Sequence, residues 1–110
     1  MTDSGLQYNF LRTADGAMPA GNSVVTLDYE GTLIDGTVFD SSYVRGEPST
    51  FSLANTISGF QEGVQLMNVG SQIRLVIPAD LAYGDQGVGT AIGPGATLIF
   101  EIELLEINSG

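Results

Sequence analysis

Hydrophobic and polar residues alternate along four stretches of the chain, and a period of two is typical of β-strands that bury one face. The stretches cover residues 6–10, 23–34, 72–77 and 97–107. In the second stretch, the face expected to be buried carries Val25, Leu27 and Tyr29. The first stretch is expected to form a short, half-buried strand, and Pro78 is expected to end the third.

One segment has the spacing of a helix instead. Hydrophobic side chains recur on one helical face at Phe60, Val64 and Met67. Ser58 is placed to cap the first turn, with Gln61 three residues later as in a capping box. Gly70 is placed to end the helix.

Turn residues separate these elements. Asp35 and Gly36 are expected to supply the φ > 0 positions of a tight hairpin, with a return strand beginning at 37–39. Residues 41–49 are polar and predict a loop or bulge before an apolar stretch at 50–53. Residues 78–96 hold five glycines and two prolines, and a loop of this length in a small domain usually has a functional reason.

The order of elements predicts an α+β fold. Consecutive strands joined by short turns favour an antiparallel sheet, and one helix is available to cover it. We therefore expect five short strands curled around a single helix. A chain of 110 residues is expected to form one domain, 1–110, with an N-terminal strand and loop over 1–22 and a core over 23–108.

Acidic residues outnumber basic ones by 13 to 3, which gives a formal net charge of -10. This charge repels phosphate backbones and anionic headgroups, so neither nucleic acid nor a membrane is an expected partner. We interpret the acidity as a solvated surface, and a dedicated cation site is the less favoured alternative. The N-terminal residues have no signal-peptide pattern, and no stretch is long enough to span a bilayer.

The chain contains no His, Cys or Lys, and these absences exclude several reaction classes. A serine or cysteine nucleophile would lack a histidine base, and a Schiff base would lack its amine. Zinc would lack its two commonest ligand types, and disulfides are impossible. We therefore expect no metal and no cofactor, so that any catalysis must proceed without these side chains.

Four short motifs follow one another along the chain. They are Val38-Phe39-Asp40-Ser41-Ser42, Gly59-Phe60-Gln61-Glu62-Gly63, Leu81-Ala82-Tyr83-Gly84, and Ala96-Thr97-Leu98-Ile99-Phe100 with Glu103-Leu104-Leu105. In this order they resemble the FKBP-type peptidyl-prolyl isomerases, over residues 5–108. Further similarity is to the bacterial macrophage infectivity potentiator (Mip-like) subgroup, in the opening Ser4-Gly5-Leu6-Gln7-Tyr8, the spacing from Phe51 to Phe60, and Ile92-Gly93-Pro94.

The resemblance implies a five-stranded antiparallel half-barrel wrapped around one short α-helix, with a substrate proline held between sheet and helix. The implied catalytic residues are Asp40, Phe60, Tyr83 and Phe100. The implied substrate-binding residues are Tyr29, Phe39, Phe51, Ile57 and Ile92. Arg45 would support Asp40 by charge. Three places depart from the family's usual residues. Phe60 replaces a Trp at the pocket floor, Thr56 replaces a Val, and the loop has Ala91-Ile92-Gly93-Pro94 where many members carry an additional proline.

The implied activity is peptidyl-prolyl cis-trans isomerisation in protein folding, with an aromatic pocket that removes water from the peptide bond. Rotation about that bond breaks no covalent bond, which suits a chain without His, Cys or Lys. One alternative is a proline-peptide-binding chaperone module of the same fold with weak or no turnover. Another is a structural domain, since aromatic residues that alternate along strands are usually core residues.

The resemblance also implies the partners. These are proline-containing peptides and unfolded protein clients, with the macrolides tacrolimus and rapamycin as candidate inhibitors. By the same resemblance, we expect a bacterial protein of the periplasm, the cell surface or the cytoplasm. In this form we expect a monomer.

Overall fold

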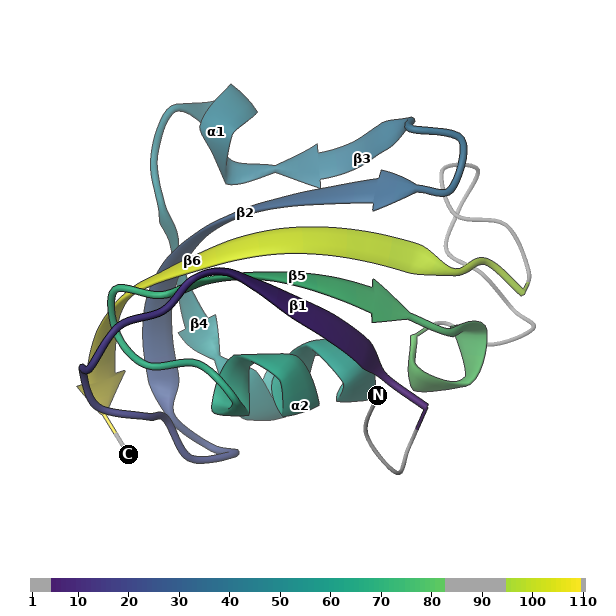
Figure 1. Cartoon of the computed structure of the whole chain (residues 1–110). Helices are drawn as coiled ribbons and strands as arrows, with labels where there is room; N and C mark the ends of the chain where they lie inside the picture. Colours follow the sequence, from purple (N-terminus) through teal and green to yellow (C-terminus); the bar gives the residue numbers. More distant parts are fainter. Residues whose placement is uncertain (1–4, 83–94, 110) are drawn as a thin grey trace.

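The computed structural model describes residues 5–82 and 95–109, without the side chains of Arg45, Asp80 and Ser109. Its strands are β1 (Gln7–Arg12), β2 (Val24–Leu33), β3 (Val38–Ser41), β4 (Ser49–Ser52), β5 (Gln72–Ile77) and β6 (Leu98–Ser109). Its helical segments are α1 (Ser42–Arg45), α2 (Ser58–Gln65) and the 3₁₀ turns η1 (Leu53–Asn55) and η2 (Ala79–Leu81). In Figure 1 the strands form a curved sheet and α2 lies beneath it. Within these ranges no helix is long and apolar enough to cross a membrane.

All strand pairs in the sheet are antiparallel, in the order β1-β5-β6-β2-β3, with β4 also paired to β2. The prediction of five strands therefore differs from the structure, which has six among the residues it describes. The reason is that β4 pairs with residues 24–27 of β2 while β3 pairs with residues 30–32. Together β3 and β4 occupy one position across the sheet, interrupted by α1. The α+β fold class is confirmed.

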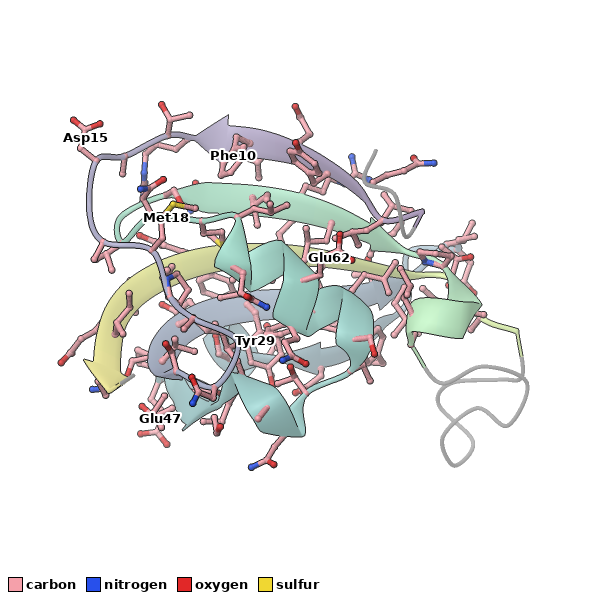
Figure 2. The ribbon with its side chains drawn as sticks, turned by 90° about the horizontal axis from the view of Figure 1, so that it is seen from below. Phe10, Asp15, Met18, Tyr29, Glu47 and Glu62 are labelled. Carbon is pink, nitrogen blue, oxygen red and sulfur yellow. The ribbon has the colours of Figure 1, made fainter. Side chains whose placement is uncertain are left out.

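The hydrophobic core lies between the concave face of the sheet and α2, which crosses that face in Figure 2. The positions predicted to face inward on β2 are buried, and so are the three predicted helix positions. On β5 and β6 the alternating apolar residues are buried as well: Ile73, Leu75, Ile77, Leu98, Phe100, Ile102 and Leu104. The helix approaches the sheet closely because Gly63 faces Leu75, where a Cβ atom would collide with the leucine side chain. This approach places Phe60, one turn earlier, against the sheet.

The two predicted helix ends were wrong. Ile57 is the N-cap and makes no side-chain cap, so Ser58 is already inside the helix. Gln61 does not complete a capping box, and its Nε2 donates instead to the carbonyl of Gly21 at 3.0 Å. The helix ends at Gln65, several residues before Gly70. Gly70 has φ +96 and serves the turn that leads into β5.

The β2–β3 connection also differs from the predicted two-residue hairpin. Within this connection only Gly36 has a positive φ, of +92, and no non-glycine residue in the described ranges has one. The Gly36 N–H donates to the Leu33 carbonyl at 3.0 Å, and the Leu33 N–H donates to Thr37 at 2.9 Å. The bond between Leu33 and Thr37 makes the turn longer than expected. Asp35 does not take a positive φ, and only Gly36 in this turn does.

Two further segments depart from the sequence-based expectation. The predicted loop over 41–49 contains α1, whose N-cap Ser41 accepts a 3.4 Å hydrogen bond from the Val44 N–H. The first strand is more exposed than half-buried, because β1 is an edge strand that pairs only with β5 among the described strands. Tyr8 accordingly remains 42% exposed.

Candidate functional site

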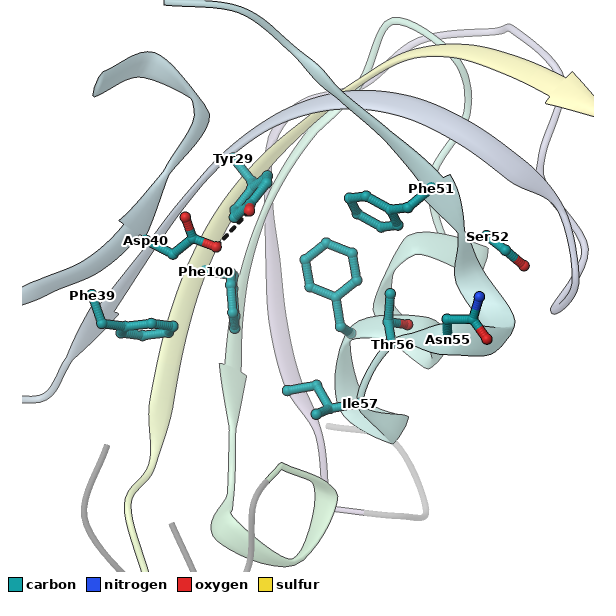
Figure 3. Close-up of a pocket in the computed structure, with 10 residues that line it drawn as sticks. Tyr29, Phe39, Asp40, Phe51, Ser52, Asn55, Thr56, Ile57 and Phe100 are labelled. Carbon is teal, nitrogen blue, oxygen red and sulfur yellow. Dashed lines mark hydrogen bonds between the residues drawn. The ribbon is translucent and has the colours of Figure 1, made fainter. Parts of the chain in front are cut away.

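A pocket of about 420 Å³ opens between the concave face of the sheet and the start of α2 (Figure 3). Its walls come from β2, β3, β4, β6 and the η1–α2 segment. The lining residues are Tyr29, Phe39, Asp40, Phe51, Ser52, Asn55, Thr56, Ile57, Phe60 and Phe100. The site thus combines residues from distant parts of the chain, which the sheet topology brings together.

Four aromatic rings form the apolar base of the pocket. Phe60 contacts the other three, with ring centroids 5.2 Å from Phe100, 5.8 Å from Phe51 and 6.1 Å from Tyr29. The rings of Phe60 and Phe100 meet edge to face at 82°, an arrangement that aromatic pairs favour. Phe60 is only 4% exposed, so the rings provide a pre-formed apolar surface.

Phe39 and Asp40 are neighbours in sequence, yet both line the pocket. In a regular strand, adjacent side chains point to opposite faces. The register between β3 and β2 shifts here, because Asp40 pairs with Gly31 while Val38 pairs with Thr32. Phe39 is therefore an extra residue, as in a β-bulge. We infer that this irregularity allows an aromatic ring and the adjacent carboxylate to line one pocket.

Asp40 is held by a hydrogen bond from across the β2–β3 pair. The Tyr29 hydroxyl donates to Asp40 Oδ2 at 2.6 Å, as the dashed line in Figure 3 shows. Asp40 is the one charged residue among those that line the pocket. Among the described lining residues, the pocket consequently has an apolar base and a single anionic group on its β3 side.

Ser42 supports this arrangement from behind the pocket. It is fully buried, and its Oγ accepts from the Tyr29 N–H at 2.9 Å and donates to Asp28 Oδ1 at 2.8 Å. A side chain therefore continues the β2–β3 pairing beyond Ser41, where β3 ends. This contact fixes the chain on both sides of the pair formed by Tyr29 and Asp40.

The opposite wall is formed by the segment that enters α2. Ile57 lines the pocket as the N-cap of α2, and the Thr56 hydroxyl donates to the Leu53 carbonyl at 2.7 Å. Among the described residues, no backbone acceptor is found for the Ile57 N–H. Ile57 therefore places both an apolar side chain and an available donor at the edge of the aromatic base.

Of the nine residues that the sequence predicts for the site, the structure brings seven together around this pocket. They are Tyr29, Phe39, Asp40, Phe51, Ile57, Phe60 and Phe100. Tyr83 and Ile92 lie outside the described residues, and so does the side chain of Arg45. No group of three or more potential metal ligands of the His, Cys, Asp or Glu type occurs in the described part of the chain.

Sequence reasoning missed some of the lining residues. Ser52 and Asn55 were not predicted, and Thr56 was noted only for its difference from the family. These polar residues carry no periodic signal. Their position between two predicted pocket residues, Phe51 and Ile57, is the feature of the sequence that points to them.

Comparison with known proteins identifies the family. The family model for the FKBP-type peptidyl-prolyl cis-trans isomerase matches residues 16–105. This chain belongs to the FKBP-type peptidyl-prolyl cis-trans isomerase family, as the four motifs predicted.

Several curated relatives are similar over nearly the whole chain. The FKBP-type 22 kDa peptidyl-prolyl cis-trans isomerase of Escherichia coli (strain K12) is 52% identical over 106 residues, which cover 96% of this chain and 52% of that protein. The Outer membrane protein MIP of Legionella longbeachae is 50% identical, with coverages of 96% and 45%. The peptidyl-prolyl cis-trans isomerase Mip of Coxiella burnetii is 47% identical, with coverages of 96% and 46%. The chain spans about half the length of these relatives.

Solved structures support the fold assignment. The crystal structure of FkpA from Escherichia coli superposes with a TM-score of 0.95 at 44% identity, and covers 98% of this chain and 50% of that one. AtFKBP13 has a TM-score of 0.87 at 33% identity, with coverages of 96% and 94%. The predicted FKBP-like fold is therefore confirmed.

Proposed function

We propose that this chain is a peptidyl-prolyl cis-trans isomerase that accelerates rotation about X-Pro peptide bonds. The observation that carries the proposal is the gathering of seven predicted residues around one pocket with an aromatic base. A proline ring is a compact apolar group that such a pocket can enclose, while a few polar groups orient the peptide. The names of the curated relatives support the same activity.

The pocket's chemistry suits a reaction that needs no acid, base or metal. Rotation about a peptide bond faces a barrier of ~18–20 kcal/mol, which arises from resonance between nitrogen and carbonyl. The planar amide separates charge more than the twisted amide and is better solvated by water. Holding the proline on four aromatic rings removes that water and favours the twisted transition state.

We assign three roles to the described residues. Phe60 and Phe100 contact the proline ring, and their positive ring edges face a carbonyl oxygen that leaves the amide plane. Asp40 stabilises the twisted carbonyl carbon electrostatically. The Ile57 N–H holds the peptide carbonyl beyond the proline, so that one side is fixed while the other turns.

Three further assignments are proposed on the family motifs alone. Tyr83 donates a hydrogen bond from its hydroxyl to the bound peptide, and Ile92 lines the pocket as a substrate-binding residue. Arg45 supports Asp40 by charge. The proposed partners are proline-containing peptides and unfolded protein clients.

An exchange experiment tests the proposal. Line-shape or exchange NMR of a short Ala-Pro peptide should show faster cis/trans exchange with micromolar wild-type protein than without it. Phe51→Ala should lose most of this acceleration, because it removes one of the four aromatic rings that form the base of the pocket. Leu11→Ala is the matched control, since Leu11 is exposed on β1 and lies outside the pocket. No acceleration by the folded wild-type protein would overturn the proposal.

The second candidate is a binding module of the same fold with little turnover. The observation that favours it is Phe60, a smaller ring than the Trp usual in the family, at the pocket base. Saturable binding of the same peptide without faster exchange would select this candidate. Tacrolimus and rapamycin are proposed as ligands of the pocket in either case, and competition with the peptide would test their binding.

A further inference from the structure

Gly31 lies between two strands that carry pocket residues, although it does not line the pocket itself. It lies on β2, where it pairs with Asp40 of β3 on one side and with Phe100 of β6 on the other. Both of these neighbours line the pocket. Gly31 is not among the glycines with positive φ, so its backbone conformation does not by itself require glycine.

Space is the reason for a glycine at this position. A Cβ atom on Gly31 would lie 2.6 Å from Phe39 Cζ and 2.8 Å from Phe100 Cε1. Ordinary contact begins at 3.4 Å. The rings of Phe39 and Phe100 therefore occupy the volume that any other residue would fill with its side chain.

Neither ring can move away from the new Cβ atom without moving the other. Phe39 and Phe100 contact each other edge to face, with centroids 5.5 Å apart and an interplanar angle of 89°. Phe100 also packs against Phe60 at 5.2 Å. A methyl group at Gly31 would push on the first pair, and the displacement would pass to the pocket base.

We propose that Gly31 is a positioning residue of the isomerase site, whose missing side chain fixes where the Phe39 and Phe100 rings stand. It sets the width of the pocket beside Asp40, and thereby how closely the peptide bond before the proline can approach that carboxylate. This inference rests on the proposed function, because it assigns the rings to the bound proline.

The test compares two glycine-to-alanine variants that each introduce a contact shorter than 3.0 Å, one against the pocket rings and one against the backbone away from the pocket. Gly31→Ala places the new methyl against the pocket rings. Gly16→Ala is the matched control, because its Cβ would lie 2.5 Å from the Val69 carbonyl oxygen, away from the pocket. Exchange rates are measured where both variants are folded, together with NOEs between ring protons of residues 39 and 100.

We expect Gly31→Ala to lower kcat/KM about tenfold or more and to shift the ring NOEs, since small misplacements in a site cost large factors in rate. Gly16→Ala should lower thermal stability and leave both readouts near their wild-type values. The same Gly31→Ala substitution in a Phe39→Leu background should cost less than about threefold, because the leucine lacks the colliding ring atoms and neighbouring mutations are not additive. Rescue of this kind distinguishes positioning from a general loss of stability.

Unchanged ring NOEs in Gly31→Ala would overturn the inference, and so would equal losses of kcat/KM in the wild-type and Phe39→Leu backgrounds. Absence of catalysis by the wild-type protein would overturn the proposed function instead. In that case the ring NOEs and the affinity for the Ala-Pro peptide still decide the role of Gly31. Displaced rings together with weaker peptide binding would support the positioning role of Gly31. Unchanged ring NOEs and unchanged peptide affinity would reject that role.

Discussion

The hydroxyl of Tyr29 donates a 2.6 Å hydrogen bond to Asp40 Oδ2, and this contact joins β2 to β3 inside the aromatic pocket. Tyr29 is 9% exposed and the bond is partly buried, and in such an environment a hydrogen bond to a carboxylate is stronger than in water. The orientation of the pocket's single lining charge therefore depends on a residue of the neighbouring strand.

Removing the Tyr29 hydroxyl should lower the activity of the site without creating a cavity in the core. Tyr29→Phe keeps the ring but leaves Asp40 without its tyrosine donor, at a cost of about 1.5–3 kcal/mol for a hydrogen bond to a charged group. We expect lower kcat/KM in peptide exchange and a lower midpoint of thermal unfolding. Tyr8→Phe is the control, because Tyr8 is exposed on β1. Equal activities of the two variants would contradict the role given to the pair.

Changing the pocket base should alter activity more than changing surface charge. Phe60→Trp adds ring volume where Phe60 already contacts Tyr29, Phe51 and Phe100. We expect a larger change in the peptide exchange rate than for Glu106→Gln, whose side chain is exposed. Equal rates for these two variants would count against Phe60 as the base of the substrate site.

Ser42 should matter for both stability and the site. Ser42→Ala removes the acceptor of the buried Tyr29 N–H and the donor to Asp28. An unsatisfied buried polar group costs roughly 1–3 kcal/mol, so chemical denaturation should show a loss of this size. Ser42→Thr keeps the hydroxyl and serves as the comparison, and should recover part of the loss. A Ser42→Ala variant with wild-type stability would show that the backbone donor finds another partner.

Acid should loosen the β2–β3 turn. The backbone hydrogen bond from the Thr37 N–H is the main reason that the pKa of Asp35 lies below its ordinary value of 3.8. Because the pKa is lower in the folded state, the stabilisation is present above the unfolded pKa and is lost as pH falls through the folded one. An NMR titration of the Asp35 carboxyl should have its midpoint below 3.8, and Asp35→Asn should remove this titration. A midpoint above that value would contradict the assignment.

The parts of the fold that the sequence could predict are those with strong periodicity. Alternation along 72–77 and 97–107 identified β5 and β6 and their buried faces, because burial on one face leaves a period of two in the sequence. The start of α2 was harder. Ser58 has the residue type of an N-cap, yet Ile57 takes that position, and its apolar side chain lines the pocket.

Part of the site could be predicted because the four family motifs contain Phe39, Asp40, Phe60 and Phe100. What the motifs could not show was how Phe39 and Asp40 come to line the same pocket, since regular alternation would separate them. The register shift beside Gly31 depends on the pairing of two strands and leaves no periodic trace in either one. The hydrogen bonds of Ser42 could not be predicted from the sequence either, because they depend on the fold bringing Tyr29 and Asp28 beside it.

The pairing of β2 with β6 has a consequence for the synthesis of this domain. Val25 pairs with Ile107 and Gly31 with Phe100, so β2 meets residues made near the end of the described chain. Contacts between such distant segments slow folding, because a long loop must close before they form. During translation the pocket wall cannot assemble until β6 has left the ribosome. A ribosome-bound chain that stops before Phe100 should therefore lack the site, even when most of its residues have already emerged.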